Sequence, residues 1–210
     1  MAQPTNTFDT YDSVGEREDL SDVIYSIAPT DTPFISSAAK TKATAVLHEW
    51  QTDSLAAAVT NNAVIEGDEA TLDASTATVR LSNSSQIMDK TVVITGTQES
   101  VDKAGRASEL AYQIAKRAKE LKRDMEATVT GNIAENAGNS STARKMGTLG
   151  AWIATNDVFG SGGGSGSAGN TARTDGTQRA FTEAQLKSVI KSCWNEGGEP
   201  SMIMVGPFNK

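Results

Sequence analysis

The residue types that most often carry catalysis are scarce in this chain. His48 is the only histidine and Cys193 the only cysteine. A nucleophile activated by histidine must lie within hydrogen-bond reach of the ring, and nothing near His48 in sequence suggests one. The same counts exclude a zinc site built from clustered histidines and cysteines. His48 alternates with Val46 and Trp50, so we interpret it as a packed sheet residue. Cys193 lies on a predicted helix and is interpreted as a packing residue.

A group of carboxylates offers the oxygen ligands that calcium prefers, namely Glu66, Asp68, Glu69 and Asp73. Their spacing does not match the calcium loop of an EF-hand. The simpler interpretation is a solvated acidic loop tip, which we favour over a calcium site.

Five basic residues lie close together near the middle of the chain: Lys116, Arg117, Lys119, Lys122 and Arg123. Such a group could contact DNA. Glu120 and Asp124 interrupt it, however, so ion pairs within one helix explain the pattern equally well.

The glycine-rich run GSGGGSGSAG, residues 160–169, might suggest a phosphate-binding loop. It lacks the lysine-serine or lysine-threonine pair of a P-loop and has no strand leading directly into it. We interpret it as a flexible insertion that forms no packed element. Taken together, these patterns predict no catalytic, cofactor-binding or metal-binding residue.

The composition limits the class of protein. The chain has 210 residues, which suits one large domain or two small ones, and only 38% are hydrophobic and 5% aromatic. This lean composition predicts an extended molecule whose partners complete the burial. A net charge of −7 argues against a general nucleic-acid binder. No apolar run approaches the roughly 18 residues of a membrane span, no signal peptide is evident, and a single cysteine suits a reducing cytoplasm.

Residues 1–44 are interpreted as an N-terminal arm. Residues 1 to about 18 are polar and are expected to be disordered unless a neighbour holds them. Four apolar residues spaced along one helical face predict a short helix, ending before Pro29: Leu20, Val23, Ile24 and Ile27. Thr32 and Pro33 mark a second helix start.

Residues 45–97 are interpreted as a long β-hairpin. Alternating patterns predict strands over residues 45–51 and 77–82, and a further strand over residues 90–95. An acidic, flexible tip lies between the first two. Because an isolated two-stranded ribbon is marginal in water, a long one suggests a partner surface.

The second half of the chain is predicted to begin with a helix over residues 98–137. At about 1.5 Å per residue, its roughly 38 residues would span about 57 Å and form a spine. The Gly/Ser-rich insertion, residues 138–180, follows. In residues 181–210, Thr182 and Gln185 form a capping box before a helix that ends at Gly197.

Residues 201–206 are predicted to be a buried strand. Five residues after such a strand cannot supply a second layer for it. We therefore expect the sequence to be a fragment of a longer protein.

Two stretches, GEREDLSDVIYSIAPTDTPF (residues 15–34) and HEWQTDSLA (residues 48–56), carry a resemblance to a known family. The chain resembles the major capsid proteins of tailed bacteriophages of the SU10-like family. The resemblance is strongest over residues 8–60 and is architectural to about residue 137. It implies an α+β, HK97-like capsid fold with an N-terminal arm, an E-loop β-hairpin, a P-domain spine helix and a partial A-domain.

The same resemblance implies a function. Members self-assemble, as hexameric and pentameric capsomers, into the icosahedral head shell around double-stranded DNA. The implied further partners are scaffold, portal or cement proteins, and packaged DNA on the inner face. The implied location is the virion, after assembly in the host cytoplasm, with no membrane contact. The family carries no catalytic residues to transfer.

Two other classes remain open at this point. A surface or tail binding module would be favoured by a secretion signal or by aromatic-lined repeats, and the sequence has neither. A small enzyme would need an acid/base or nucleophile constellation, and none is evident.

Overall fold

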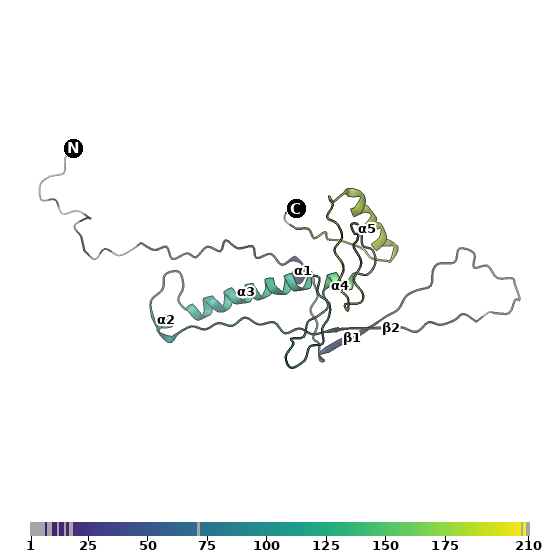
Figure 1. Cartoon of the computed structure of the whole chain (residues 1–210), viewed down its shortest axis with the longest axis horizontal. Coiled ribbons are helices and arrows are strands. Elements are labelled where there is room, and N and C mark those ends of the chain that lie inside the picture. Colours follow the sequence, from purple (N-terminus) through teal and green to yellow (C-terminus); the bar gives the residue numbers. More distant parts are fainter. Residues whose placement is uncertain are drawn as a thin grey trace. The chain divides into compact units, whose positions relative to one another are not determined.

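The computed structural model describes residues 7, 10–11, 13–14, 16, 19–70, 72–206 and 208. Most of the predicted disordered stretch over residues 1 to 18 lies outside the described residues. Figure 1 labels the elements: α1 (Pro33–Ser37), β1 (Leu47–Thr52), β2 (Val79–Ser84), α2 (Gly96–Ser100), α3 (Glu109–Val129), α4 (Leu149–Trp152) and α5 (Glu183–Asn195). The chain divides into two compact units. One joins Lys90–Glu120 to the described part of Met1–Thr30, and the other joins Asp31–Asp89 to Leu121–Lys210.

The helix predicted over residues 20–27 is absent, so that prediction is wrong. This segment has no helical turns and all of its side chains are exposed, Ile27 completely. A helix of two turns is too short to be stable without a packing partner. The segment is held in part by Gly105, whose backbone N–H donates to Asp22 Oδ1 at 3.2 Å.

The predicted hairpin is confirmed at its base. β1 and β2 pair antiparallel, with Leu47 opposite Ser84 and Thr52 opposite Val79. The Trp50 ring lies 5.1 Å from the Trp152 ring, centroid to centroid. The further strand predicted over residues 90–95 does not form, because no strand in the described part of the chain pairs with it.

The excursion, defined here as residues 53–78 between β1 and β2, is exposed at every described position. Figure 1 shows it as a long loop that leaves the end of the hairpin and returns to it. Its regular hydrogen bonding is local, with one turn closed by Asp68 N–H donating to Ile65 O at 3.1 Å. The fold thus supplies nothing that buries the excursion within its own unit.

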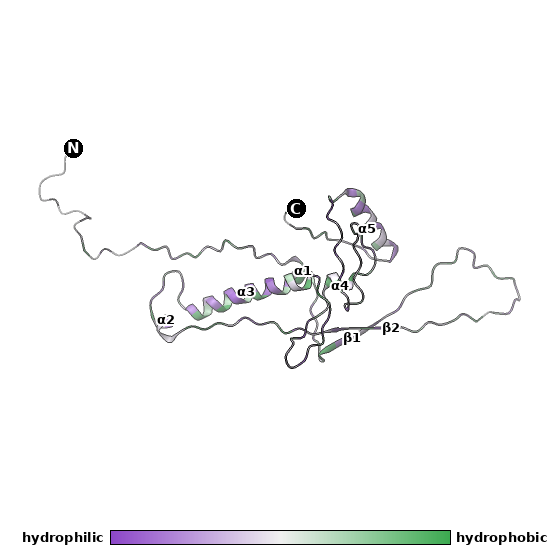
Figure 2. Cartoon of the chain, in the orientation of Figure 1, coloured by the Kyte–Doolittle hydropathy of each residue, from purple (hydrophilic) through white to green (hydrophobic). Residues whose placement is uncertain are grey.

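The predicted spine helix is shorter than expected. α3 has 21 residues, or about 32 Å at 1.5 Å per residue, instead of the range 98–137. Gly105 takes a φ of +74° and interrupts the helical path between α2 and α3. Figure 2 shows apolar and polar residues alternating around α3, as expected of an amphipathic helix.

The Gly/Ser-rich segment is not a flexible linker, so that interpretation is wrong. Isolated β-bridges pair Asn136 with Lys145, Gly164 with Thr174 and Ser167 with Thr171. Its glycines allow backbones to approach where side chains would not fit. A methyl group at Gly166 would lie only 2.5 Å from the carbonyl oxygen of Ala151.

The start and end of α5 are as predicted. Thr182 and Gln185 form the capping box, and the Thr182 N–H donates to Gln185 Oε1 at 3.2 Å. At the other end, Gly197 and Gly198 donate to carbonyls of the last helical turn, the pattern of a Schellman motif.

The strand predicted over residues 201–206 is absent, and this prediction is also wrong. These residues are exposed and carry no strand assignment. A strand requires a neighbour to pair its backbone groups, and the described residues provide none here.

The hydrophobic core is very small, in line with the low hydrophobic and aromatic content. Among the described residues, Ala151 is the buried hydrophobic residue, with 0% exposure, whereas most buried side chains are polar: Thr32, Ser84, Glu109 and Thr148. No helix in the described residues is long and apolar enough to cross a membrane.

Candidate assembly surfaces

A buried hydroxyl holds the second unit together. Thr148 is 1% exposed, and its Oγ1 accepts a hydrogen bond from Ile133 N–H at 2.8 Å and donates to Gly131 O at 2.9 Å. Its own N–H donates to Ile133 O at 3.0 Å. The residues that follow α3 and those that precede α4 are therefore joined by hydrogen bonds.

Two asparagines extend this junction by pairing with backbone groups. Asn83 of β2 accepts from Gly147 N–H at 2.8 Å and donates to Gly147 O at 2.9 Å. Asn132 forms the same two-point pairing with Arg173, at 2.9 and 2.8 Å. A side-chain amide that donates and accepts in this way replaces one rung of a sheet. We call the contacts of Thr148, Asn83 and Asn132 the polar junction.

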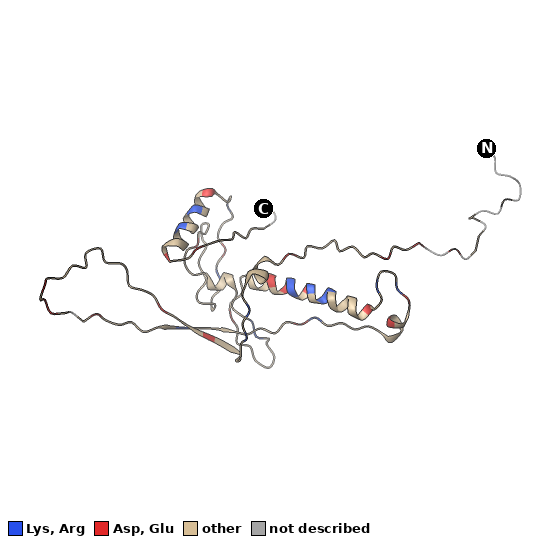
Figure 3. Ribbon diagram, turned by 180° about the vertical axis from the view of Figure 1, so that it is seen from behind, with Lys and Arg blue, Asp and Glu red and all other residues tan. Residues whose placement is uncertain are grey.

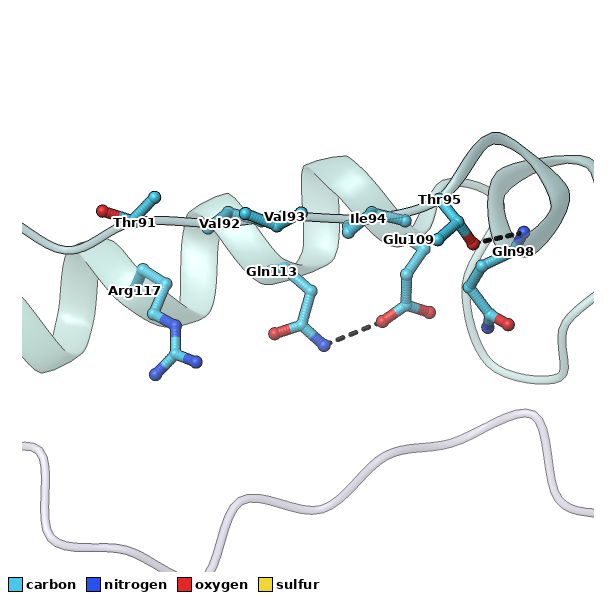
Figure 4. Close-up of a pocket in the computed structure, with 9 residues that line it drawn as sticks. All are labelled: Thr91, Val92, Val93, Ile94, Thr95, Gln98, Glu109, Gln113 and Arg117. Atoms are coloured by element: carbon cyan, nitrogen blue, oxygen red, sulfur yellow. Dashed lines mark hydrogen bonds between the residues drawn. The ribbon is translucent and has the colours of Figure 1, made fainter.

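The first unit contains a groove of about 470 Å³ beside α3. Figure 4 shows the extended segment Thr91–Thr95 running along the helix, which contributes Glu109, Gln113 and Arg117. Val92 and Ile94 are half-buried, whereas Val93 between them is exposed. The segment thus has the alternation of a strand, with backbone groups that pair with no other strand in the described residues.

The start of α3 is fixed by charged hydrogen bonds. Glu99 Oε2 accepts from Glu109 N–H at 3.0 Å and from Leu110 N–H at 3.1 Å, so its charge lies at the positive end of the helix dipole. A hydrogen bond with the Ser108 side chain lowers the pKa of the Glu99 carboxyl, and the Leu110 N–H adds to this effect.

Glu109 is 6% exposed and is bonded on both carboxylate oxygens. Gln113 Nε2 donates to it at 2.7 Å, and Arg106 forms an ion pair with it. These two contacts lower the pKa of the Glu109 carboxyl, the Gln113 hydrogen bond most strongly. The groove wall therefore carries a fixed, fully partnered negative charge.

The C-terminal half of α3 contacts another helix, since one of its side chains caps the start of α1. The two carboxylate oxygens of Glu126 accept from Phe34 N–H and Ile35 N–H, each at 2.8 Å. Lys122 Nζ donates to Ser36 Oγ at 3.0 Å. The described features are a helix that contacts different segments along its length, exposed extended segments, and a polar junction. Such features are typical of a subunit of an assembly rather than of an active site.

Comparison with known proteins agrees with this description. The sequence matches the family described as SU10 major capsid protein over residues 3–210. The chain belongs to this family. It is also 40% identical over 126 residues to the major capsid protein of Escherichia phage Phieco32. That alignment covers 60% of this chain and 36% of the phage protein, so the chain matches about a third of that relative.

In this major capsid family member, none of the described contacts joins the residues considered for chemistry into one site. His48 is exposed rather than packed into a core, with its ring 6.0 Å from that of Trp50. Cys193 is half-buried on α5 beside Trp194, which is 74% exposed. No metal-ligating cluster occurs among the described residues.

The acidic and basic groups lie on different elements of the chain. Glu66, Asp68, Glu69 and Asp73 all lie exposed in the excursion. The five basic residues lie along α3, where Figure 3 shows them as blue segments of the helix. Arg117 forms an ion pair with Glu120, so part of the predicted intrahelical pairing is confirmed.

Sequence reasoning missed the polar junction. Thr148, Asn83 and Asn132 belong to no apolar pattern and follow no motif, and each acts on backbone groups distant in sequence. A usable signal was the number of glycines around them: Gly147, Gly150, Gly166 and Gly169. Glycines mark places where two backbones approach closely.

Proposed function

We propose that this chain is part of a major capsid protein that self-assembles into the icosahedral head shell of a tailed bacteriophage with a double-stranded DNA genome. The family match over residues 3–210 carries the proposal. The very small core and the exposed extended segments support it, because such a chain gains most of its burial from neighbouring copies.

The parts of the chain correspond to an HK97-like fold under this proposal. Residues 1–44 are the N-terminal arm, residues 45–97 the E-loop β-hairpin, and residues 98–137 the P-domain with α3 as its spine. Residues 138–180 are the Gly/Ser-rich insertion, and residues 181–210 begin the A-domain. The open hairpin and the amphipathic α3 support these assignments.

The proposed partners are other copies of the chain, in hexameric and pentameric capsomers. Scaffold, portal or cement proteins and packaged DNA on the inner face complete the set. The protein assembles in the host cytoplasm and resides in the virion. Nothing in its proposed role requires catalysis.

Negative-stain microscopy of the full-length purified protein tests the proposal. We expect closed shells, capsomers or sheets. Monodisperse monomers at high concentration would contradict the proposed function.

A matched variant sharpens the experiment. Replacing residues 56–75 by a short Gly-Ser turn leaves the β1–β2 pairs and the polar junction intact. We expect its circular dichroism to retain the helical signal while shells no longer form. A variant that assembles normally would show that the excursion has no part in assembly.

A further inference from the structure

The base of the β1–β2 hairpin is attached to its unit along β2 by a row of hydrogen bonds. Each of residues 83–86 bonds, through its side chain or its backbone carbonyl, to a residue between 135 and 147. The contacts pair Asn83 with Gly147, Ser84 with Glu135, Ser85 with Arg144, and Gln86 with Met146. We call this row the hairpin seam. It is partly shielded from water, since Ser84 is 5% exposed.

β1 is attached in a different way, through an aromatic contact. Its hydrogen bonds among the described residues go to β2 or to the adjoining Thr78. The Trp50 ring lies 5.1 Å from the ring of Trp152 at the end of α4, with an angle of 39° between the ring planes. This distance is within the range of about 4.5 to 7 Å at which aromatic rings attract each other. On the other side of Trp50, the His48 ring lies 6.0 Å away.

Trp152 offers β1 a fixed surface, because its indole rests on the glycine-rich backbone. A methyl group at Gly169 would lie 2.8 Å from Cε2 and Nε1 of Trp152. Gly169 is itself held on both sides. Its N–H donates to Ala151 O at 3.1 Å, and its carbonyl oxygen accepts from Glu135 N–H at 2.7 Å. The ring that meets Trp50 is therefore backed by a hydrogen-bonded backbone.

The two attachments act at different places on the hairpin. A row of contacts along one strand still lets a hairpin swing about that strand. Trp50 lies on the neighbouring strand, about 4.8 Å to the side. It pairs with Leu81, whereas the seam begins at Asn83, so it also lies about 7 Å farther along the hairpin. A second attachment that is displaced in both directions prevents the swing.

We propose that Trp50 and Trp152 are positioning residues, whose contact sets the direction in which the hairpin leaves its unit. The excursion continues from the far end of the hairpin (Figure 1). An extended chain from Asp53 to Glu66 covers up to about 43 Å at about 3.3 Å per residue, so a swing of about 10° at the base would move its end by about 7 Å. A small change at two rings therefore has a large effect on where the excursion lies.

The consequence for assembly rests on the proposed function. A hairpin that swings freely must be ordered each time a neighbouring copy binds it, and this ordering costs conformational entropy. A hairpin with a fixed direction is already ordered at its base, and every copy begins assembly with the same geometry. We therefore expect the ring contact to make the shells uniform in size.

The distance between two spin labels tests the inference directly. In a Cys193→Ser background, Val79→Cys labels the far end of the hairpin and Ala127→Cys labels α3 in the same unit, and both positions are exposed. Double electron–electron resonance on the unassembled protein gives the distribution of label distances. Trp50→Ala is expected to broaden this distribution at least twofold, because the hairpin then swings about its seam. An unchanged width would overturn the proposal.

Two controls separate the direction of the hairpin from general stability. Trp50→Phe keeps a ring that can meet Trp152, and it is expected to keep the width within about 1.3-fold of the unmodified protein. Trp194→Ala removes a tryptophan of α5 that is 74% exposed, and it is expected to leave the distribution unchanged. If Trp194→Ala broadens the distribution as much as Trp50→Ala does, the chain has loosened generally and the proposal is wrong.

Trp152→Ala opens the same contact from the other side, and circular dichroism checks its helical signal. A folded variant is expected to show the broadening of Trp50→Ala, and the double variant should broaden the distribution no further, because both substitutions remove one contact. Additive broadening would contradict the proposal. If Trp152→Ala loses its helical signal, Trp50→Ala decides the result, since it leaves the packing of Trp152 on Gly169 in place.

Negative-stain microscopy of the full-length protein extends the test to the shell. The unmodified protein and Trp50→Phe are expected to form particles of uniform diameter, and Trp50→Ala particles whose diameters spread at least twofold more widely. Uniform particles from Trp50→Ala would show that neighbouring copies set the direction by themselves, and would overturn the role in assembly. If the unmodified protein forms no assemblies at all, the proposed function fails, while the label distances still decide whether the ring contact positions the hairpin.

Discussion

The excursion and the glycine-rich region, residues 131–177, make an instructive pair. Both are poor in large apolar residues and rich in small or polar ones. The excursion is exposed throughout, whereas the glycine-rich region closes on itself through backbone bridges and the polar junction. Similar compositions therefore give opposite structures.

The two regions differ in their number of closely packed glycines and in the positions of side-chain amides. The excursion has one glycine, Gly67, at a turn where a methyl group would meet nothing within 4 Å. In the glycine-rich region, methyl groups at Gly147 and Gly166 would overlap backbone atoms at 2.7 and 2.5 Å. Backbones can then bond to each other directly, and Asn83 and Asn132 complete the pairing. Composition alone does not distinguish a linker from a glycine-packed core.

Hydrogen exchange should give the largest contrast between the two regions. In unassembled protein, we expect amides of the excursion to exchange at nearly unprotected rates, while Ile133 and Gly150, bonded in the junction, exchange at least a hundredfold more slowly. Assembly should protect the excursion and leave the junction little changed. Equal protection of the excursion before and after assembly would contradict this account.

A single methyl group should break the glycine-packed region. Gly166→Ala places a Cβ against the backbone of Ala151, and we expect it to lower the free energy of unfolding by about 3 kcal/mol. The matched control is Gly164→Ala in the same segment, where the nearest atom lies 4.0 Å away. Thermal unfolding followed by circular dichroism compares the two. Similar midpoints would show that the close approach is not required.

The buried hydroxyl should have a smaller effect. Thr148→Val keeps the shape but leaves Ile133 N–H and Gly131 C=O without their side-chain partner. We expect a loss of about 2 kcal/mol, because unsatisfied buried groups lose their full hydration. As a control, Thr177→Val removes an exposed hydroxyl bonded to Ser161 O and should change the free energy of unfolding by less than about 0.5 kcal/mol. If Thr148→Val lowers the free energy of unfolding no more than Thr177→Val does, the hydrogen bonds of the polar junction do not stabilise the fold.

The smallest effect concerns pH and lies in the first unit. The pKa of Glu99 is lowered in the folded chain, chiefly by its hydrogen bond with Ser108. As pH falls, the unfolded chain therefore takes up the proton first, at about pH 4.3. The stabilisation is present above that value and disappears as pH falls through the lower folded pKa.

Unfolding midpoints measured between pH 7 and pH 3 test this sign. Glu99→Gln should flatten the acidic part of the profile. A steeper profile for Glu99→Gln would show that the sign is wrong.

The sequence predicted those features that depend on neighbours along the chain. The capping box of α5 and the β1–β2 ladder follow from local patterns, and both were confirmed. The helix over residues 20–27 and the strands over residues 90–95 and 201–206 were wrong, since periodic apolar residues form such elements only when a partner covers them. α3 was overextended at both ends, because the chain leaves the helical path at Val101 and Gly105 before the helix begins and the helix ends at Val129.

The candidate surfaces were only partly predictable. The sequence shows which residues of the excursion and of α3 are charged. It does not show which of these charges already have a hydrogen-bond or ion-pair partner in the fold. Glu126, for example, caps a helix that lies 91 residues earlier in the chain. Such long-range hydrogen bonds leave no periodic trace, and the polar junction was missed for the same reason.

The polar junction also sets how the protein responds to temperature. The heat-capacity change on unfolding rises with exposed apolar area and falls with exposed polar area. A core made of a threonine, two asparagines and packed backbone exposes mainly polar groups when it opens. We therefore expect a small heat-capacity change on unfolding and a shallow stability curve for the single chain. Under the proposed function, apolar surface buried between copies adds to the area exposed on disassembly and unfolding, so we expect a larger heat-capacity change for the assembled particle than for the single chain.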